Sequence, residues 1–279
     1  MPANFFYGII SWVINMIKLV VTDLDGTLVC NHKVSAENLK TIKALQDRNY
    51  LFTVATGRHI DSARRVTDHI DLKLPMICNN GAQIIDTKTF DILYEVPVDE
   101  HHVRDIVSYC DENDIQYLLC SSRHILCSLE AQQLLLKHVG KVPVIIQEDS
   151  ELKLAISKGI IKVLVVDFNQ KKLDSVTKFL EDRDDLAVVM SQTGFLNISH
   201  KDATKGTALN HLAEMLDVSL SETLALGDEE NDTTMIMNAG IGVAMGNGTK
   251  KLKELADDIT LSNCKDGFTH TIKKHILNT

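Results

Sequence analysis

The sequence of 279 residues has only 4 prolines, 14 glycines and a single tryptophan, and it contains no internal repeat or low-complexity segment. This composition excludes a collagen-like chain and a long disordered linker, because both need far more proline or glycine. Apolar residues make up 44% of the chain and charged residues 24%, which is close to the average for globular proteins. At this length, folding buries roughly 75% of the extended surface, so the core needs no cross-link to be stable.

Cysteine is also sparse, and no cysteine pair or cysteine–histidine cluster has the spacing of a zinc site. A zinc ribbon and a disulfide-packed small domain are therefore excluded. We expect free, mostly buried thiols and a protein of the reducing cytoplasm. The six positions are Cys30, Cys78, Cys110, Cys120, Cys127 and Cys264.

The apolar run near the N-terminus, residues 5–17, is too short to span a membrane. It has about 13 residues and ends at Lys18, whereas a membrane helix needs ~20. It also lacks the basic leading segment and the cleavage site of a secretory signal. We expect residues 1–15 to be an N-terminal extension outside the fold, with Met16 as an alternative start. A peripheral membrane anchor is the other interpretation.

Positive charge is in deficit, since 29 basic residues stand against 38 acidic ones and give a formal net charge of −9. An acidic chain gains nothing from counterion release on DNA or RNA, so we expect no nucleic-acid partner. A phosphorylated small molecule is compatible with this charge, because a bound metal ion reverses the local field. The sequence leaves open whether the protein is a monomer or a homodimer.

Short apolar runs alternate with helical patterns in the first and last parts of the chain. Ser35 is placed to cap a helix whose apolar residues recur at helical spacing. Strands that alternate with helices favour right-handed crossovers and a parallel sheet covered on both faces, an α/β fold. The predicted strands lie at residues 17–22, 51–56, 75–79, 223–226 and 241–244, and the late helices at 207–216 and 232–239.

A different texture begins near residue 83, where strands and helices mix and charged turns interrupt them. We predict an α+β domain at residues 83–194, inserted into a core formed by residues 16–82 and 195–279. Its predicted strands lie at 91–96, 115–119, 161–166 and 186–191, and its helices at 100–113 and 171–183.

The strongest functional signal is an acidic motif, Asp23-Leu24-Asp25-Gly26-Thr27, directly after the first predicted strand. Ligands of open α/β sheets bind beyond the carboxyl ends of the strands, so we expect these carboxylates in the crevice. One carboxylate can attack phosphorus while the other donates a proton to the leaving oxygen. A calcium loop is excluded, because the positions of its required glycine and glutamate hold Leu28 and Val34.

Three weaker signals each allow a second interpretation. Thr56-Gly57-Arg58 ends a predicted strand and offers either a phosphate seat or only a helix cap. Lys205 opens a helix as either a solvated side chain or a cation for charge on phosphoryl oxygens. Gly227-Asp228-Glu229-Glu230-Asn231-Asp232 offers oxygen ligands to a hard cation, or an acidic helix start favoured by the helix dipole.

These four segments, in this order, resemble the haloacid dehalogenase superfamily of phosphotransferases, and within it the Cof-type sugar-phosphatase-like subfamily. The resemblance runs from about Met16 to the C-terminus, and the pairing of the first and last motifs is its most specific part. Two further segments are also similar to segments of that subfamily, Asn79-Asn80-Gly81-Ala82 and Gly242-Val243-Ala244-Met245-Gly246-Asn247. The resemblance implies a Rossmann-like parallel-sheet core with an inserted α+β cap domain, which closes over the site and selects the leaving group.

The same resemblance implies a Mg²⁺-dependent phosphomonoester hydrolase acting on small phosphorylated metabolites such as sugar phosphates. Asp23 would be the nucleophile that forms an aspartyl-phosphate, and Asp25 the general acid/base. The implied phosphate-binding residues are Leu24, Thr56, Gly57, Lys205 and Asn231. The implied metal ligands are Asp23, Asp25 through its backbone carbonyl, Asp228 and Asp232. Arg58 and Asn80 are implied on the substrate side.

Two alternatives stay open at this stage. A phosphomutase-type phosphotransferase would share the same core residues. A catalytically silent metabolite-binding protein would be expected to have lost one of the implied catalytic residues, and all are present. In the insertion, Tyr117 and Arg123 either face the substrate or lie on the surface, and the sequence does not identify the substrate.

Overall fold

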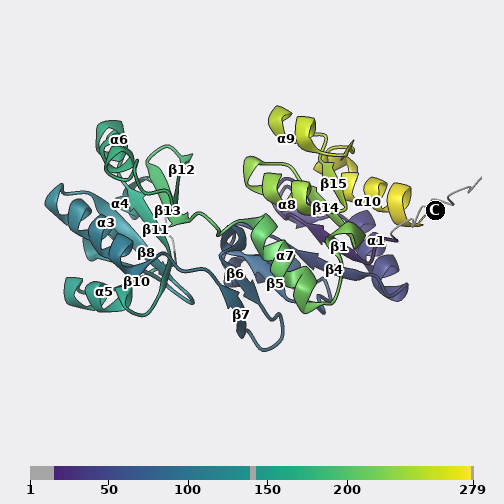
Figure 1. Ribbon diagram of the computed structural model, residues 1–279, viewed down its shortest axis with the longest axis horizontal. Helices are drawn as coiled ribbons and strands as arrows, with labels where there is room; N and C mark the ends of the chain where they lie inside the picture. Colours follow the sequence, from purple (N-terminus) through teal and green to yellow (C-terminus); the bar gives the residue numbers. More distant parts are fainter. Residues whose placement is uncertain (1–15, 139–142, 278–279) are drawn as a thin grey trace, which may run out of the picture.

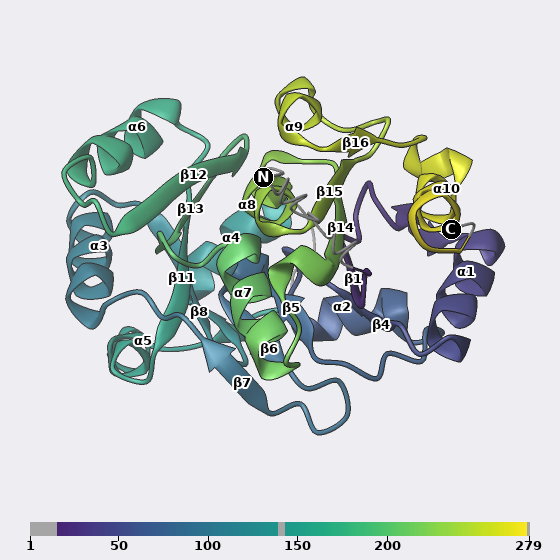
Figure 2. The same ribbon diagram turned by 45° about the vertical axis from the view of Figure 1, so that its right-hand side comes forward.

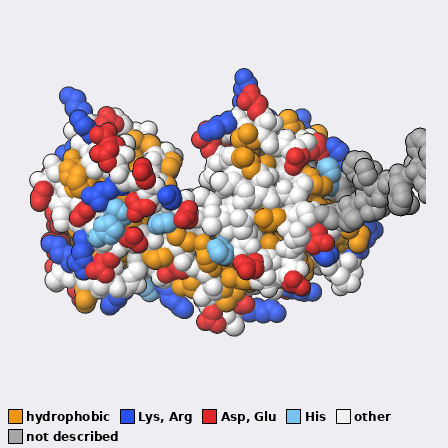
Figure 3. Space-filling model, in the orientation of Figure 1, with side chains coloured by type: hydrophobic (Ala, Val, Ile, Leu, Met, Phe, Trp, Pro, Cys, Tyr) orange, Lys and Arg blue, Asp and Glu red, His pale blue; other side chains and the backbone are white. Residues whose placement is uncertain are grey.

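A computed structural model of the protein describes residues 16–138 and 143–277. These residues form two lobes (Figure 1). Figure 3 shows a hollow between the lobes on one face. The N-terminal extension predicted for residues 1–15 lies outside the described residues. No helix in the described part is long and apolar enough to cross a membrane.

The first lobe is built on a five-stranded sheet in which all paired strands run parallel. Its strand order is β16-β15-β14-β1-β4, so the strand that precedes the acidic motif lies beside the strand that precedes the late acidic loop (Figure 2). The α/β prediction is therefore confirmed. The strands are β1 (Leu19–Thr22), β4 (Leu51–Val54), β14 (Thr223–Gly227), β15 (Ile241–Ala244) and β16 (Asp258–Ile259).

Helices cover both faces of this sheet. Successive residues of β1 point to opposite faces, so Val20 packs in one apolar cluster while Leu19 and Val21 pack in the other. Ser35 caps α1 as predicted, because its hydroxyl accepts the Asn38 backbone N–H. One face is covered by α1 (Ala36–Asp47), α2 (Ile60–Thr67) and α10 (Gly267–Ile272), and the other by α7 (Lys205–Met215), α8 (Thr233–Asn238) and α9 (Lys250–Leu255).

The strand predicted at residues 75–79 forms, but it does not simply extend the parallel sheet. It is β5 (Met76–Cys78), which pairs antiparallel with β6 (Gln83–Ile85), and β6 pairs with β7 (Ile92–Glu95). A single parallel bridge, Ala55 to Ile77, connects it to the chain beyond β4. The left-handed backbone of Asn79 and Asn80 turns the chain back into β6 so soon that the hairpin is the nearer pairing partner.

The second lobe is the predicted α+β segment, built on a six-stranded sheet with the order β10-β9-β8-β11-β13-β12. Three helices cover one face, α3 (Glu100–Glu112), α5 (Asp149–Ile156) and α6 (Gln170–Phe179), while α4 (Leu129–His138) packs on a separate apolar cluster. The strands are β8 (Gln116–Ser121), β9 (Ile125–Cys127), β10 (Ile145–Ile146), β11 (Ile160–Val166), β12 (Leu186–Gln192) and β13 (Phe195–His200).

The sheets refine the domain boundaries. The hairpin β6–β7 continues the small sheet that starts with β5, and β13 pairs with β11 and β12 of the second lobe. Boundaries at 82/83 and 194/195 would therefore assign β6 and β13 to a different domain from the strands with which they pair, β5 and β12. We propose that the core comprises residues 16–96 and 202–279 and the cap residues 97–201.

The expectation of free thiols was wrong for two of the six cysteines. Cys30 and Cys264 form a disulfide with their Cα atoms 5.2 Å apart, across 234 positions of sequence. It ties the hairpin of β2 (Val29–Cys30) and β3 (Lys33–Val34) to the short helix η4 (Asn263–Lys265). The other four cysteines are free and buried, as predicted. Spacing arguments missed the pair because the contact arises only when η4 packs beside the β2–β3 hairpin.

Candidate active site

The two acidic segments meet because β1 and β14 are neighbours in the sheet. Both strands run in the same direction, so their carboxyl ends open onto one edge. The backbone N–H of Asp23 still donates to the carbonyl of Leu226, at 2.9 Å, which fixes the first carboxylate against the end of β14. Segments 200 residues apart in sequence therefore share one crevice, as the motif order predicted.

Three buried carboxylates form the centre of this crevice. Asp23, Asp228 and Asp232 each offer one oxygen, and these oxygens lie within 4.8 Å of one another. Asp23 and Asp228 are 5% exposed and Asp232 is fully buried. Hard divalent cations prefer clustered carboxylate oxygens, so the donor set fits such an ion. Asp25, which the resemblance gave as a ligand through its carbonyl, has its side chain outside this cluster.

Crowding of negative charge in a buried space shifts the carboxyl groups toward their neutral form. Burial, with the nearby carboxylates of Asp232 and Asp228, raises the pKa of Asp23 to about 7, although the attraction of Lys205 opposes this. Burial is also the main cause that raises the pKa of Asp228 to about 6. A cation at the cluster would offset both effects by favouring the ionised carboxylates.

Lys205 is fully buried and lies between two of these acids. Its Nζ donates to Asp23 Oδ1 and to Asp232 Oδ1, each at 2.6 Å. Burial alone would lower the pKa of this ammonium, but attraction to the two carboxylates outweighs it and raises the pKa. One ammonium shared by two acids leaves net negative charge, which agrees with the raised pKa of Asp23. The structure therefore assigns Lys205 to the site rather than to a solvated surface.

Residues around the cluster hold Asp228 in place. The hydroxyl of Thr27 donates to Asp228 Oδ1 at 2.7 Å, and Asn247 Nδ2 donates to the Gly26 carbonyl at 2.8 Å. Gly26 has φ of +84°, and a Cβ there would lie 2.1 Å from Asp228 Oδ2. Sequence reasoning gave no role to Thr27 or Asn247. The signals were the place of Thr27 inside the first motif and the place of Asn247 at the end of the segment at residues 242–247, which resembles the same subfamily.

Asp232 has a second task besides its ion pair with Lys205. Its Oδ2 accepts the backbone N–H groups of Asp228 and Glu229, at 2.9 and 3.0 Å. It therefore shapes the loop that carries Asp228, in addition to lying in the carboxylate cluster. This loop contains the short helix η3 (Glu230–Asp232), from which Asn231 extends toward solvent.

Asp25 lies beside the cluster and is paired with Arg58. The guanidinium makes a two-pronged contact, with Nε to Oδ2 at 2.6 Å and Nη2 to Oδ1 at 2.5 Å. Asp25 keeps 52% of its side chain exposed, so it faces the open part of the crevice. The hydrogen bonds to this carboxylate raise the pKa of Arg58. The sequence placed Arg58 on the substrate side but did not predict this pairing.

The remaining predicted residues gather on a second edge of the crevice. Thr56 is buried, and its hydroxyl accepts the Arg58 backbone N–H at 3.2 Å. Asn80 donates its backbone N–H to the Thr56 carbonyl, at 3.0 Å, and accepts from Asn231 Nδ2 at 2.9 Å. A Cβ at Gly57 would lie 2.6 Å from Asn80 Oδ1, so any larger residue here would displace the Asn80 side chain. Leu24 lies in the apolar core with a fully buried side chain, which leaves only its backbone for a role in binding.

Comparison with known proteins agrees with this geometry. Residues 20–272 match the family of haloacid dehalogenase-like hydrolases. The phosphatase YwpJ of Bacillus subtilis is 30% identical over 93% of this chain and 100% of its own. A 5-amino-6-(5-phospho-D-ribitylamino)uracil phosphatase of the same organism, YcsE, is 26% identical over 94% of this chain and 96% of its own. The crystal structure of TM0651 from Thermotoga maritima superposes with a TM-score of 0.82 at 26% identity, covering 93% of this chain and 97% of that one. The chain therefore belongs to the haloacid dehalogenase-like hydrolase family and is a phosphatase within it.

Proposed function

We propose that the protein is a Mg²⁺-dependent phosphomonoester hydrolase that dephosphorylates small phosphorylated metabolites through a covalent intermediate on Asp23. The observation that carries the proposal is the buried grouping of Asp23 with Lys205 and two further carboxylates. Mg²⁺ at the carboxylates would neutralise charge on the phosphoryl oxygens. Asp23, Asp228, Asp232 and the Asp25 carbonyl would hold it.

In the first half-reaction, a carboxylate oxygen of Asp23 attacks phosphorus while the bond to the leaving oxygen breaks. Asp25 gives its proton to that oxygen, so the product leaves as a neutral alcohol. In the second half-reaction, water attacks the aspartyl-phosphate, Asp25 takes the proton of that water, and Asp23 is regenerated. The exposed position of Asp25 suits both transfers, because substrate and water reach it from the open crevice.

The other residues bind the phosphoryl group. Lys205 holds positive charge next to the nucleophile. Thr56, Gly57, Asn231 and the Leu24 backbone N–H would contact phosphoryl oxygens, and Asn80 would orient Asn231 through their hydrogen bond. Arg58 would contact the leaving group after exchanging its contact with Asp25. A pre-positioned set of donors stabilises charge with little reorganisation during the reaction.

A small metabolite is the substrate class we favour. The relative YcsE is named for a phosphorylated ribitylaminouracil, a molecule of that size, and the chain spans nearly its whole length. We keep the predictions of a cytoplasmic protein, without a nucleic-acid partner and either monomeric or homodimeric, as parts of the proposal. The Cys30–Cys264 disulfide makes the cytoplasmic prediction worth direct test by cell fractionation.

The test is release of inorganic phosphate from a panel of phosphorylated metabolites with Mg²⁺. Wild type is compared with Asp23→Asn and with Asp182→Asn, a control at an exposed acid of the cap. We expect Asp23→Asn to lower kcat more than about 1,000-fold and Asp182→Asn to leave it unchanged. EDTA should abolish the activity and added Mg²⁺ should restore it. Turnover that survives in Asp23→Asn would refute the nucleophile.

A phosphomutase is the alternative that this test also addresses. It would move the phosphoryl group between positions of a phosphorylated sugar and release little inorganic phosphate. The silent-binding alternative is disfavoured, because the lysine–carboxylate contacts are all in place. Mass spectrometry of the products separates the hydrolase from the mutase.

A further inference from the structure

A cavity of about 530 Å³ lies between the core and the cap, next to Asp25. Helix α2 and the turn before it form one wall, from Arg58 to Arg65. The β8–β9 turn and β10 of the cap form the other, with Arg123 and Ile145 among the lining residues. Because Arg58 both lines the cavity and contacts Asp25, a group attached to the leaving oxygen would have room to extend past Arg58 into this space.

The cavity is positively charged in a protein whose net charge is −9. Its charged lining consists of Arg58, Arg65 and Arg123 against a single acid, Asp61. Arg58 is already paired with Asp25. Within residues 16–138 and 143–277, neither Arg65 nor Arg123 forms an ion pair. Two arginines from different lobes thus present uncompensated charge to the same space.

A histidine on the same wall has one ring nitrogen without a hydrogen-bond partner. His59 caps α2, because its Nδ1 accepts the Asp61 backbone N–H at 3.3 Å. That contact assigns the proton of the neutral ring to Nε2. Nε2 is buried, and it is the one buried side-chain polar atom of the described residues without a partner. A buried donor of this kind favours an acceptor-bearing ligand nearby.

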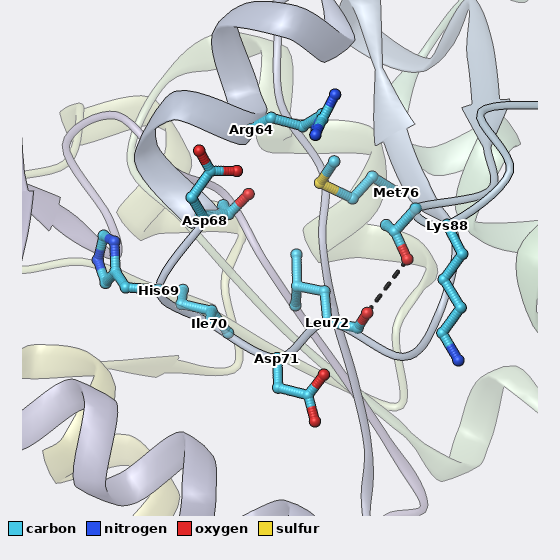
Figure 4. A pocket seen from close by; sticks show the side chains of 10 residues that line it. Arg64, Asp68, His69, Ile70, Asp71, Leu72, Met76 and Lys88 are labelled. Carbon is cyan, nitrogen blue, oxygen red and sulfur yellow. Dashed lines mark hydrogen bonds between the residues drawn. The ribbon is translucent and has the colours of Figure 1, made fainter.

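A second cavity shows that this charge pattern is not general. It has a volume of about 450 Å³ and lies at the C-terminal end of α2 (Figure 4). Its lining holds Arg64 and Lys88 together with Asp68 and Asp71, so the charges of the lining balance. Arg64 also stacks over the Phe90 ring, with its guanidinium carbon 4.2 Å from the ring centroid.

We infer that the cavity beside Asp25 binds a second anionic group, a phosphate or a carboxylate, on the leaving group of the substrate. Arg65 and Arg123 would hold that anion, and the apolar side chains of Ile125, Val144 and Ile145 would contact the carbon skeleton. The substrate class is then a doubly anionic small metabolite, either a bisphosphate or a phosphorylated acid. This inference rests on the proposed phosphatase function, since it concerns the leaving group of that reaction.

The test compares kcat/KM for matched substrates that differ in the second anion. Fructose 1,6-bisphosphate is paired with fructose 6-phosphate, and 3-phosphoglycerate with glycerol 3-phosphate, so the two pairs separate phosphate from carboxylate. We expect wild type to prefer the doubly anionic member of at least one pair by about 10-fold or more. Arg123→Gln and Arg65→Gln should each reduce that preference by about 10-fold. Arg64→Gln, on the same helix as Arg65, should leave it unchanged.

The outcomes separate this inference from the proposed function. Hydrolysis of p-nitrophenyl phosphate with Mg²⁺ reports the phosphatase alone, because this compound has no second anion. If wild type hydrolyses it but shows no preference in either pair, the anion site is refuted and the phosphatase stands. A loss of preference that is equal in Arg64→Gln and Arg123→Gln also refutes the site. If neither p-nitrophenyl phosphate nor any metabolite is hydrolysed, the proposed function fails first.

Discussion

The buried carboxylate cluster predicts that the free energy of unfolding depends on pH through Asp23, the proposed nucleophile. The pKa of Asp23 is raised from 3.8 to about 7 in the folded protein, mainly by burial. Between these values the unfolded chain has lost the proton that the folded chain still holds. The free energy of unfolding contributed by this group therefore falls as pH rises, and this stability is lost completely above pH 7.

The magnitude follows from the size of the shift. Each unit of pKa difference corresponds to about 1.4 kcal/mol, so the group contributes about 3 kcal/mol less at pH 8 than at pH 5. Asp23 is 5% exposed, and solvent therefore screens little of this effect. In Asp23→Asn the titrating group is absent and this part of the pH dependence should disappear. Several surface acids, such as Glu222, have lowered pKa values that act in the opposite direction in both proteins.

The measurement is chemical denaturation of wild type and Asp23→Asn at pH 5 and pH 8, in EDTA and then in Mg²⁺. In EDTA, the stability of wild type relative to the variant should fall by about 3 kcal/mol between the two pH values. Mg²⁺ should stabilise wild type more at pH 8 than at pH 5, because protons compete with the cation for the carboxylates. Parallel pH dependences of the two proteins in EDTA would show that Asp23 titrates normally and would refute the reasoning.

Three further changes have expected outcomes. Lys205→Met leaves two buried carboxylates without their cation, so it should lower the free energy of unfolding by about 3–5 kcal/mol in urea and abolish phosphate release. Gly26→Ala puts a Cβ onto the Asp228 carboxylate, so titration calorimetry should show weaker Mg²⁺ binding than in wild type. Unchanged Mg²⁺ affinity would argue against metal binding at Asp228. Cys264→Ser removes the Cys30–Cys264 disulfide and should lower the free energy of unfolding by about 2–5 kcal/mol. Dithiothreitol should have that effect on wild type and none on Cys264→Ser.

The fold could be predicted from the sequence wherever a residue pattern is compatible with only one arrangement of strands and helices. The runs that became β1, β4, β14 and β15 are apolar, short and separated by helical spacing, which is typical of a doubly covered parallel sheet. The strand at residues 75–79 was assigned to the same sheet, but its partner was decided by the left-handed turn at Asn79 and Asn80. Nothing in an apolar run of this length distinguishes the two pairings. In the six-stranded sheet, β8, β11 and β12 were predicted, whereas β9, β10, β13 and the order of the strands were not.

The site divides in the same way. Asp23 and Asp228 could be predicted to meet, because both follow strands of one parallel sheet. Lys205 opens a helix and does not follow a strand, so the strand rule did not apply to it. Only the family resemblance placed it near Asp23. Tyr117 and Arg123 were left open between substrate and surface, and the structure separates them: Tyr117 is buried in the cap, whereas Arg123 lines the cavity. The sequence carries side-chain chemistry but not the direction of a side chain in an inserted domain.

The pairing of Arg58 with Asp25 connects the reaction to the choice of leaving group. The turn after β4, which would offer Thr56 and Gly57 to the phosphoryl group, also places a guanidinium on the proposed acid. In that contact both carboxylate oxygens of Asp25 are engaged, so the acid cannot reach a leaving oxygen. We expect that an anionic leaving group would give Arg58 a replacement partner and would free Asp25 as it enters. Binding of the correct substrate would therefore free Asp25, which must then give its proton to the leaving group.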